Sequence, residues 1–105
     1  MDVVNVFDKK AFAAEKLKKV GLFDTPRFFC DLYCLEPGQE QKAHSHAGED
    51  KVYFVLEGKA KVRVGDEERE LGANMITLAP AGQEHGVVNH TGERCTMLVF
   101  MAPKP

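Results

Sequence analysis

Residues 38–64 read GQEQKAHSHAGEDKVYFVLEGKAKVRV, and this stretch decides the fold. It holds three short strand candidates, at Lys42–His46, Val52–Leu56 and Lys59–Val64, with glycine-containing turns between them. Short strands that follow one another at regular spacing, with such turns between them, are typical of a β-sandwich or a closed β-barrel.

Strand candidates also lie on both sides of this stretch. Phe28–Leu35 precedes it, is rich in aromatic residues, and ends at the turn signal Pro37-Gly38. Three more follow it, at Met75–Leu78, Gly86–Asn89 and Cys95–Met101. We therefore expect an all-β protein.

The N-terminal segment has a different composition, because charged residues dominate it. Asp8 is a candidate cap for a short helix over Lys9–Val20, with Gly21 as its stop. The sequence thus predicts an N-terminal arm or short helix over residues 1–25, followed by a β-barrel over residues 26–105.

Two strand candidates do not alternate between apolar and polar residues. Val52–Leu56 and Cys95–Met101 are almost continuously apolar, so both faces of each strand should be covered. A barrel interior covers one face, and the N-terminal segment or a second subunit must cover the other. We expect a homodimer, whereas the alternating strand Lys59–Val64 should keep its lysines and arginine in water.

Composition narrows the class of protein. The chain has 105 residues and 44% hydrophobic residues, enough for one domain with its own core. Lys and Arg number 14 against 16 for Asp and Glu, and this absence of a basic excess argues against nucleic-acid binding. No apolar run is long enough to span a membrane.

The expected location is the cytoplasm. The N-terminus lacks a signal-peptide pattern, and the cysteine count of three is odd. Cys30 and Cys34 would sit ~13 Å apart along one strand, too far for a disulfide.

Three of the four histidines form a candidate metal site. His44 and His46 are two residues apart in a strand, so their side chains point to the same face. His85 is the candidate third ligand from another strand, because the tight turn Pro80-Ala-Gly82 precedes it. Imidazoles bind divalent iron, manganese, nickel, zinc or copper, and the spacing does not select among these metals. The fourth, His90, is expected at the surface.

The spacing around these histidines resembles the cupin superfamily. Gly38, His44-Ser-His46 and Gly58 stand at the spacing of the first cupin motif, and Pro80-Ala-Gly82-Gln-Glu-His85-Gly-Val-Val-Asn89 resembles the second. The resemblance covers about residues 35–100. It implies a small double-stranded β-helix, a jelly-roll barrel, with a metal held inside by His44, His46, residue 51 and His85.

The chain departs from the cupin pattern at two positions. Asn74 stands where the second motif opens with glycine, and asparagine tolerates the left-handed backbone that such a turn needs. Lys51 stands where the first motif has a glutamate ligand. Three arrangements follow: three histidines completed by water, a site in which a bulge brings Asp50 to the metal, or a metal-free site in which Lys51 binds an anion.

Two functions from different classes remain open. In the first, the barrel binds a divalent metal and a small oxygen-bearing ligand, and if it is an enzyme, the resemblance implies a metal-dependent dioxygenase, isomerase or lyase. In the second, it is a non-catalytic, metal-free barrel that binds an anion or a sugar-like molecule. Lys51 and Tyr53, which share one strand face, are the candidate contacts for that small molecule. No catalytic residue is assigned.

Overall fold

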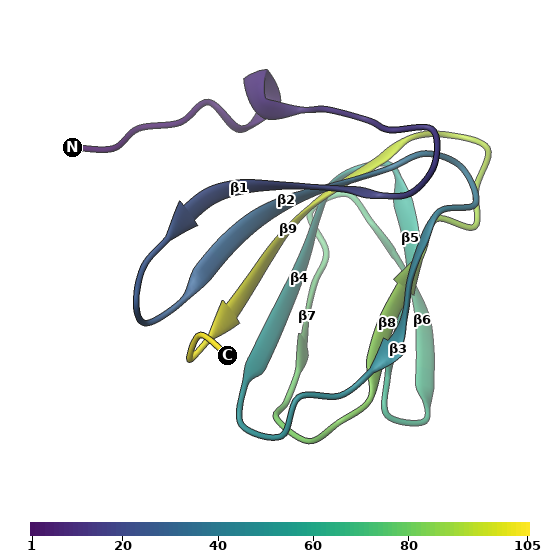
Figure 1. Ribbon diagram of the computed structural model, residues 1–105. Helices are drawn as coiled ribbons and strands as arrows, with labels where there is room; N and C mark the ends of the chain where they lie inside the picture. Colours follow the sequence, from purple (N-terminus) through teal and green to yellow (C-terminus); the bar gives the residue numbers. More distant parts are fainter.

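The computed structural model describes all residues, 1–105, as two antiparallel β-sheets packed face to face (Figure 1). The five-stranded sheet has the order β1-β2-β9-β4-β7, with bounds Lys18–Asp24, Phe29–Leu35, Cys95–Ala102, Asp50–Glu57 and Ile76–Ala79. The four-stranded sheet has the order β3-β8-β5-β6, with bounds Glu40–His44, His85–Val88, Lys59–Val64 and Glu67–Gly72. The all-β jelly-roll expectation is therefore confirmed.

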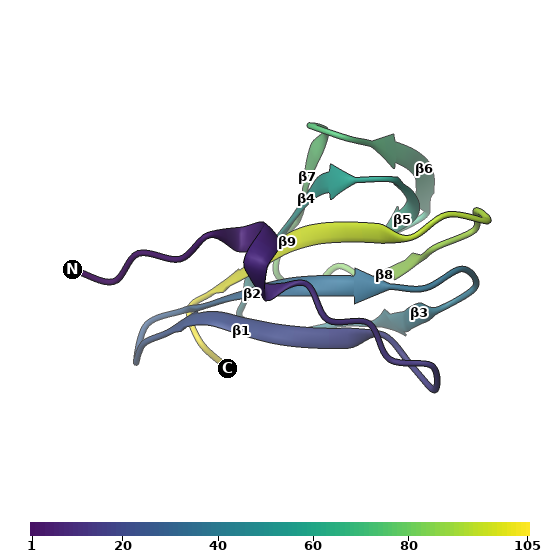
Figure 2. The same ribbon diagram turned by 90° about the horizontal axis from the view of Figure 1, so that it is seen from above.

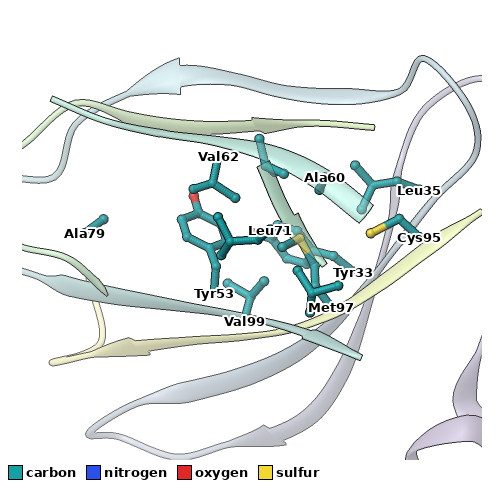
Figure 3. Close-up of a cluster of buried hydrophobic side chains, with 12 residues drawn as sticks. Tyr33, Leu35, Tyr53, Ala60, Val62, Leu71, Ala79, Cys95, Met97 and Val99 are labelled. Atoms are coloured by element: carbon teal, nitrogen blue, oxygen red, sulfur yellow. The ribbon is translucent and has the colours of Figure 1, made fainter. Parts of the chain in front are cut away.

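The hydrophobic core lies between the two sheets (Figure 3). Tyr53 and Val55 of β4 pack there with Met97 and Val99 of β9, and Val62 comes from the opposite sheet. The burial of each such side chain stabilises the fold by about 1.5–3 kcal/mol. This core fixes which residues of β4 face inward, and so it also fixes the direction of Lys51, two residues before Tyr53.

The helix expected over Lys9–Val20 is wrong. The only helical element is a 3₁₀ turn, η1, at Val6–Lys9, and β1 already begins at Lys18. Gly21 lies inside β1 rather than at a helix end. Pairing with β2 satisfies the backbone hydrogen bonds of this segment and places Val20 opposite Leu32. These interactions outweigh a weak helical pattern.

The N-terminal segment is thus part of the barrel. Residue 25, the expected end of the arm, lies in the turn that joins β1 to β2. The residues before β1 cross the outer face of β1, β2 and β9 (Figure 2). On that face Leu32 and Cys34 of β2 are fully buried, so the arm supplies part of the cover that the apolar strands require.

The rest of that outer face remains open. Ile76 and Leu78 of β7 are 64% and 52% exposed, and Phe100 of β9 is 36% exposed. Val52 stands opposite both Leu78 and Phe100 in the strand register, so these side chains share one face. An apolar surface therefore extends over β7, β4 and β9.

Several local expectations hold in the structure. Asn74 has a φ of 71°, the left-handed conformation expected where the motif has glycine. Cys30, Cys34 and Cys95 are free thiols. The single helical turn is far too short to cross a bilayer.

Candidate metal centre

The three histidines of the motifs meet at one end of the barrel. His44 is the last residue of β3, His85 is the first of β8, and the two are cross-strand partners. His46 follows in the loop between β3 and β4, and this loop lies at the lower end of the barrel in Figure 1. The ring centroid of His44 lies 4.9 Å from that of His46 and 4.5 Å from that of His85.

The ligand atoms of this triad are close enough to share an ion. One nitrogen from each ring lies within 4.8 Å of the others, a group that could hold a metal. Nitrogens bound to one ion at ~2.0–2.1 Å lie about 3–4 Å apart, so small side-chain rotations would complete the approach. The structure thus brings together the three histidines that the sequence selected.

Backbone carbonyls orient two of the rings. His44 Nδ1 lies 2.8 Å from the carbonyl oxygen of Lys42, and His85 Nδ1 lies 3.1 Å from that of Gln83. A carbonyl only accepts, so each Nδ1 carries the hydrogen and donates it. Each Nε2 then keeps a free lone pair, as in the outer-shell arrangement typical of metal-bound histidine.

His85 carries the strongest indication of a ligand. Its side chain is 1% exposed, and its Nε2 is the single buried side-chain nitrogen or oxygen without a hydrogen-bond partner. A buried acceptor without a partner costs about 1–3 kcal/mol. A metal ion at the triad would use this lone pair, so the residues present fit a divalent metal.

Burial also favours the neutral form of His85 and His44. It lowers the pKa of His85 to about 4 and shifts the pKa of His44 in the same direction. The positive charge of Lys51 adds to both shifts. Neutral imidazole is the form that binds metals, so the site is prepared for an ion at neutral pH.

The outer side of the triad is formed by His46. Its side chain is 28% exposed, and its Nδ1 lies 3.9 Å from Glu49 Oε1. The other carboxylate oxygen of Glu49 accepts a hydrogen bond of 2.8 Å from the backbone N–H of Gly48. The triad therefore has a buried side at His85 and a solvent-facing side at His46.

Lys51 points into the barrel beside the triad. Its side chain is 2% exposed, and its Nζ donates to Gln41 Oε1 at 3.1 Å. The ammonium also lies 5.5 Å from the ring centroid of Tyr33 and 5.3 Å from that of Tyr53. Burial, with a further contribution from Lys19, lowers its pKa to about 8. The interior therefore holds a cation at the position where the motif has a carboxylate.

Asp50 lies outside the histidine cluster. Its Oδ1 accepts a hydrogen bond of 2.9 Å from the backbone N–H of Ala81, and its side chain is exposed. At this end β4 pairs regularly with β9, Asp50 opposite Ala102 and Lys51 opposite Met101. The bulge that would bring Asp50 to the triad is not present in this structure.

Tyr53 belongs to a chain of polar groups beside Lys51. Its hydroxyl donates to Gln41 Oε1 at 3.2 Å, and Gln41 Nε2 donates to the hydroxyl oxygen of Tyr33 at 3.1 Å. The ring of Tyr53 is 6.2 Å from that of His85. Lys51, Tyr53, Gln41 and Tyr33 are called the interior polar cluster below.

Sequence reasoning missed Gln41, which sits at the centre of this cluster. Alternation would place residues 41 and 44 on opposite faces of a strand. The pairing of β3 with β8 shifts between Gln41 and His44, so a bulge turns both side chains inward. The glycine at position 86 was the one sequence signal of this bulge. A Cβ at that position would lie 2.9 Å from both the backbone oxygen of Gln41 and the backbone nitrogen of Ala43.

Two other polar residues do not reach the site. His90 pairs with Glu70 at the surface, at 2.8 Å. Asn89 donates to the carbonyl oxygens of Leu35 and Glu93 and accepts from Thr91, so it stabilises the turn after β8.

Comparison with known families places this fold and site. A cupin domain matches residues 31–101, well over half of the chain. The chain therefore belongs to the cupin family, and the resemblance seen in the two histidine motifs is confirmed.

Individual relatives agree with this assignment. The crystal structure of TT1209 from Thermus thermophilus is 44% identical, covers 100% of both chains and has a TM-score of 0.98. An uncharacterized protein of Streptomyces coelicolor is 35% identical over 72 residues, 69% of this chain and 67% of its own length. The oxalate-binding protein of Thermotoga maritima is 28% identical over 89 residues, 85% of this chain and 70% of its own length.

Proposed function

We propose that this cupin barrel binds a divalent transition metal through His44, His46 and His85 and presents it to a small oxygen-bearing ligand. The observation that carries the proposal is the buried, unpartnered Nε2 of His85 within the group of three close imidazoles. Three neutral nitrogen ligands leave coordination positions free, which a binding or catalytic site requires.

The metal can be iron, manganese, nickel, zinc or copper, since imidazole suits all of them. When bound, it would supply a Lewis acid for oxygen ligands. Lys51 and Tyr53 would contact the small molecule from the barrel interior. The similarity to a protein named for oxalate binding supports a ligand rich in oxygen.

A metal-free anion-binding barrel is the second candidate. The observation that favours it is the inward ammonium of Lys51, which repels a cation and attracts an anion. A metal in the purified protein would support the first candidate function, and its absence would support the second.

Elemental analysis of protein purified without added metal, followed by zinc titration in a calorimeter, tests the proposal. We expect about one metal per chain and a loss of at least tenfold in zinc affinity for His44→Gln and for His85→Gln. His90→Gln is the matched control, because that histidine pairs with Glu70 away from the triad. Zinc affinity unchanged in both triad variants would contradict the proposal, and a metal-free protein that binds no zinc would favour the second candidate.

We also propose a homodimer formed through the outer face of the five-stranded sheet. The exposed apolar residues Ile76, Leu78 and Phe100 support it, because they share the face that the N-terminal arm leaves open. A second copy of the same face supplies a matching apolar surface.

The free thiols support a cytoplasmic location.

A further inference from the structure

We propose that a small carboxylate anion binds between the Lys51 ammonium and the metal at the histidine triad, and that metal and carboxylate bind cooperatively. This inference rests on the proposed metal site and names the class of its ligand. The juxtaposition of a buried cation with an all-imidazole metal site is the feature that favours an external anion.

The ammonium of Lys51 is under-satisfied. It has three N–H donors, and one of them donates to Gln41 Oε1 at 3.1 Å. That same oxygen already accepts from the Tyr53 hydroxyl at 3.2 Å. None of the ion pairs in the structure includes Lys51, although its side chain is only 2% exposed. A buried ammonium without a carboxylate partner is costly, and an anion would remove that cost.

The triad adds to this positive charge when it is loaded. Neutral imidazoles bring no negative charge, so a dication there would repel the ammonium. The half-buried Asp31 carboxylate opposes this charge but forms no ion pair with Lys51. An anion that contacts both cations converts repulsion into two attractions.

Tyr53 connects the two groups in space. Tyr53 borders both, with its ring centroid 5.3 Å from Lys51 Nζ and 6.2 Å from the ring of His85. A carboxylate with one oxygen on an ammonium and the other on a metal spans roughly 6–7 Å between the two cations. We therefore expect one carboxylate group to contact both cations.

The open edge between β1 and β3 also favours an anion. A hollow of about 470 Å³ lies there, lined by Lys16, Lys18 and Lys19, and by Gln41 of the interior polar cluster. Lys19 Nζ lies 5.3 Å from the ring centroid of Tyr33, which belongs to that cluster. Lysines outnumber the one acidic residue of the hollow, Glu40, so the field there attracts anions.

Calorimetric titration of zinc into metal-free protein, at neutral pH in a buffer free of carboxylates, is the test. It is run with chloride alone, with acetate, and with acetamide, a neutral molecule of the same shape as acetate, at matched ionic strength. We expect acetate to lower the zinc dissociation constant at least tenfold and acetamide to leave it unchanged. By linkage, zinc should tighten acetate binding by the same factor.

Variants separate Lys51 from a general effect of acetate. In Lys51→Met, zinc should bind more tightly than in the wild type without acetate, and the acetate effect should disappear. Lys51→Arg keeps the charge and should keep the acetate effect, and so should Lys59→Met, which removes an exposed lysine of β5. Near-ultraviolet circular dichroism checks that each variant is folded.

The outcomes distinguish the two proposals. Zinc binding in the wild type that acetate does not change would overturn the cooperative carboxylate while leaving the metal site intact. An acetate effect of equal size in Lys51→Met would overturn it as well, because the anion would then need only the metal. Zinc binding that is absent under every condition would instead remove the metal site itself.

Discussion

The positive charge of Lys51 opposes the binding of a metal ion at the histidine triad. At an effective dielectric of about 20, a unit charge and a dication ~6 Å apart interact by several kcal/mol before relaxation. Lys51→Glu removes this repulsion and supplies an internal carboxylate, so we expect zinc affinity to rise at least tenfold in carboxylate-free buffer.

Lys51→Met should increase the same affinity by a smaller factor, because it removes the charge without adding a ligand. Asp50→Ala is the comparison, since the Asp50 carboxylate contacts Ala81 rather than the triad. Calorimetry that finds Lys51→Glu without effect and Asp50→Ala unable to bind would place Asp50 at the metal instead.

The buried amine also affects the stability of the metal-free protein. Burial lowers the pKa of Lys51 to about 8 in the folded state, from an ordinary value of 10.5. Below about pH 8 both states carry the charge, and the folded state bears the full cost of burying it. As the pH rises from about 8 to 10.5, the folded protein loses its proton first and this cost disappears.

Lys51→Met should therefore be about 2–3 kcal/mol more stable than the wild type at neutral pH. The advantage should shrink by about 2 kcal/mol between pH 7 and pH 9.5. Urea unfolding of both proteins, with a chelator present, measures the difference between their free energies of unfolding. Titration of the groups that both proteins share cancels in this difference. A gap that stays constant over this range would mean that the amine reaches water.

Among the secondary-structure elements, the bulge of β3 opposite Gly86 positions the site. A Cβ at residue 86 would lie 2.9 Å from the Gln41 oxygen and the Ala43 nitrogen, and both of these are backbone atoms. We expect Gly86→Ala to lower the free energy of unfolding by about 2–3 kcal/mol, because the strands must separate to admit the methyl group.

The same substitution should weaken zinc binding, since His44 and His85 are cross-strand partners next to the bulge. Gly92→Ala is the matched control, because nothing lies within 4 Å of a Cβ there. Thermal unfolding and zinc titration of both variants make the comparison. Equal behaviour of the two would show that β3 and β8 adjust freely.

The elements also show how far sequence reasoning reaches. The triad was predictable because His44, His46 and His85 lie in two motifs with fixed spacing. The direction of Lys51 was not, because Val52–Leu56 is apolar at every position and gives no alternation to read. Gln41 was missed since a bulge reverses the expected face of a strand, and bulges depend on contacts with the partner strand.

The N-terminal segment was misread for a related reason. Its helical pattern is local, whereas the pairing of β1 with β2 is decided by the partner strand and the sheet that it extends. A short amphipathic pattern is a weak prior against such pairing.

For the whole molecule, the open apolar face predicts the state of association. Replacing Ile76 and Leu78 together by lysine should convert a dimer into a monomer, because four-carbon charged chains would have to enter an apolar interface. Lys59→Glu, on the wet face of β5, should leave the dimer unchanged. Sedimentation velocity at micromolar concentrations reads the outcome, and a wild-type protein that is monomeric there would contradict the proposed interface.

The uneven exposure of the triad has a kinetic consequence. His85 is sealed inside the barrel, whereas His46 is 28% exposed and stands beside the carboxylate of Glu49. An incoming ion would meet His46 first and reach His85 last, and a departing ion would release its ligands in the reverse order. The half-life of the loaded protein in a chelator would then be sensitive to His46, the last ligand that a departing ion contacts, while the equilibrium affinity depends on all three imidazoles.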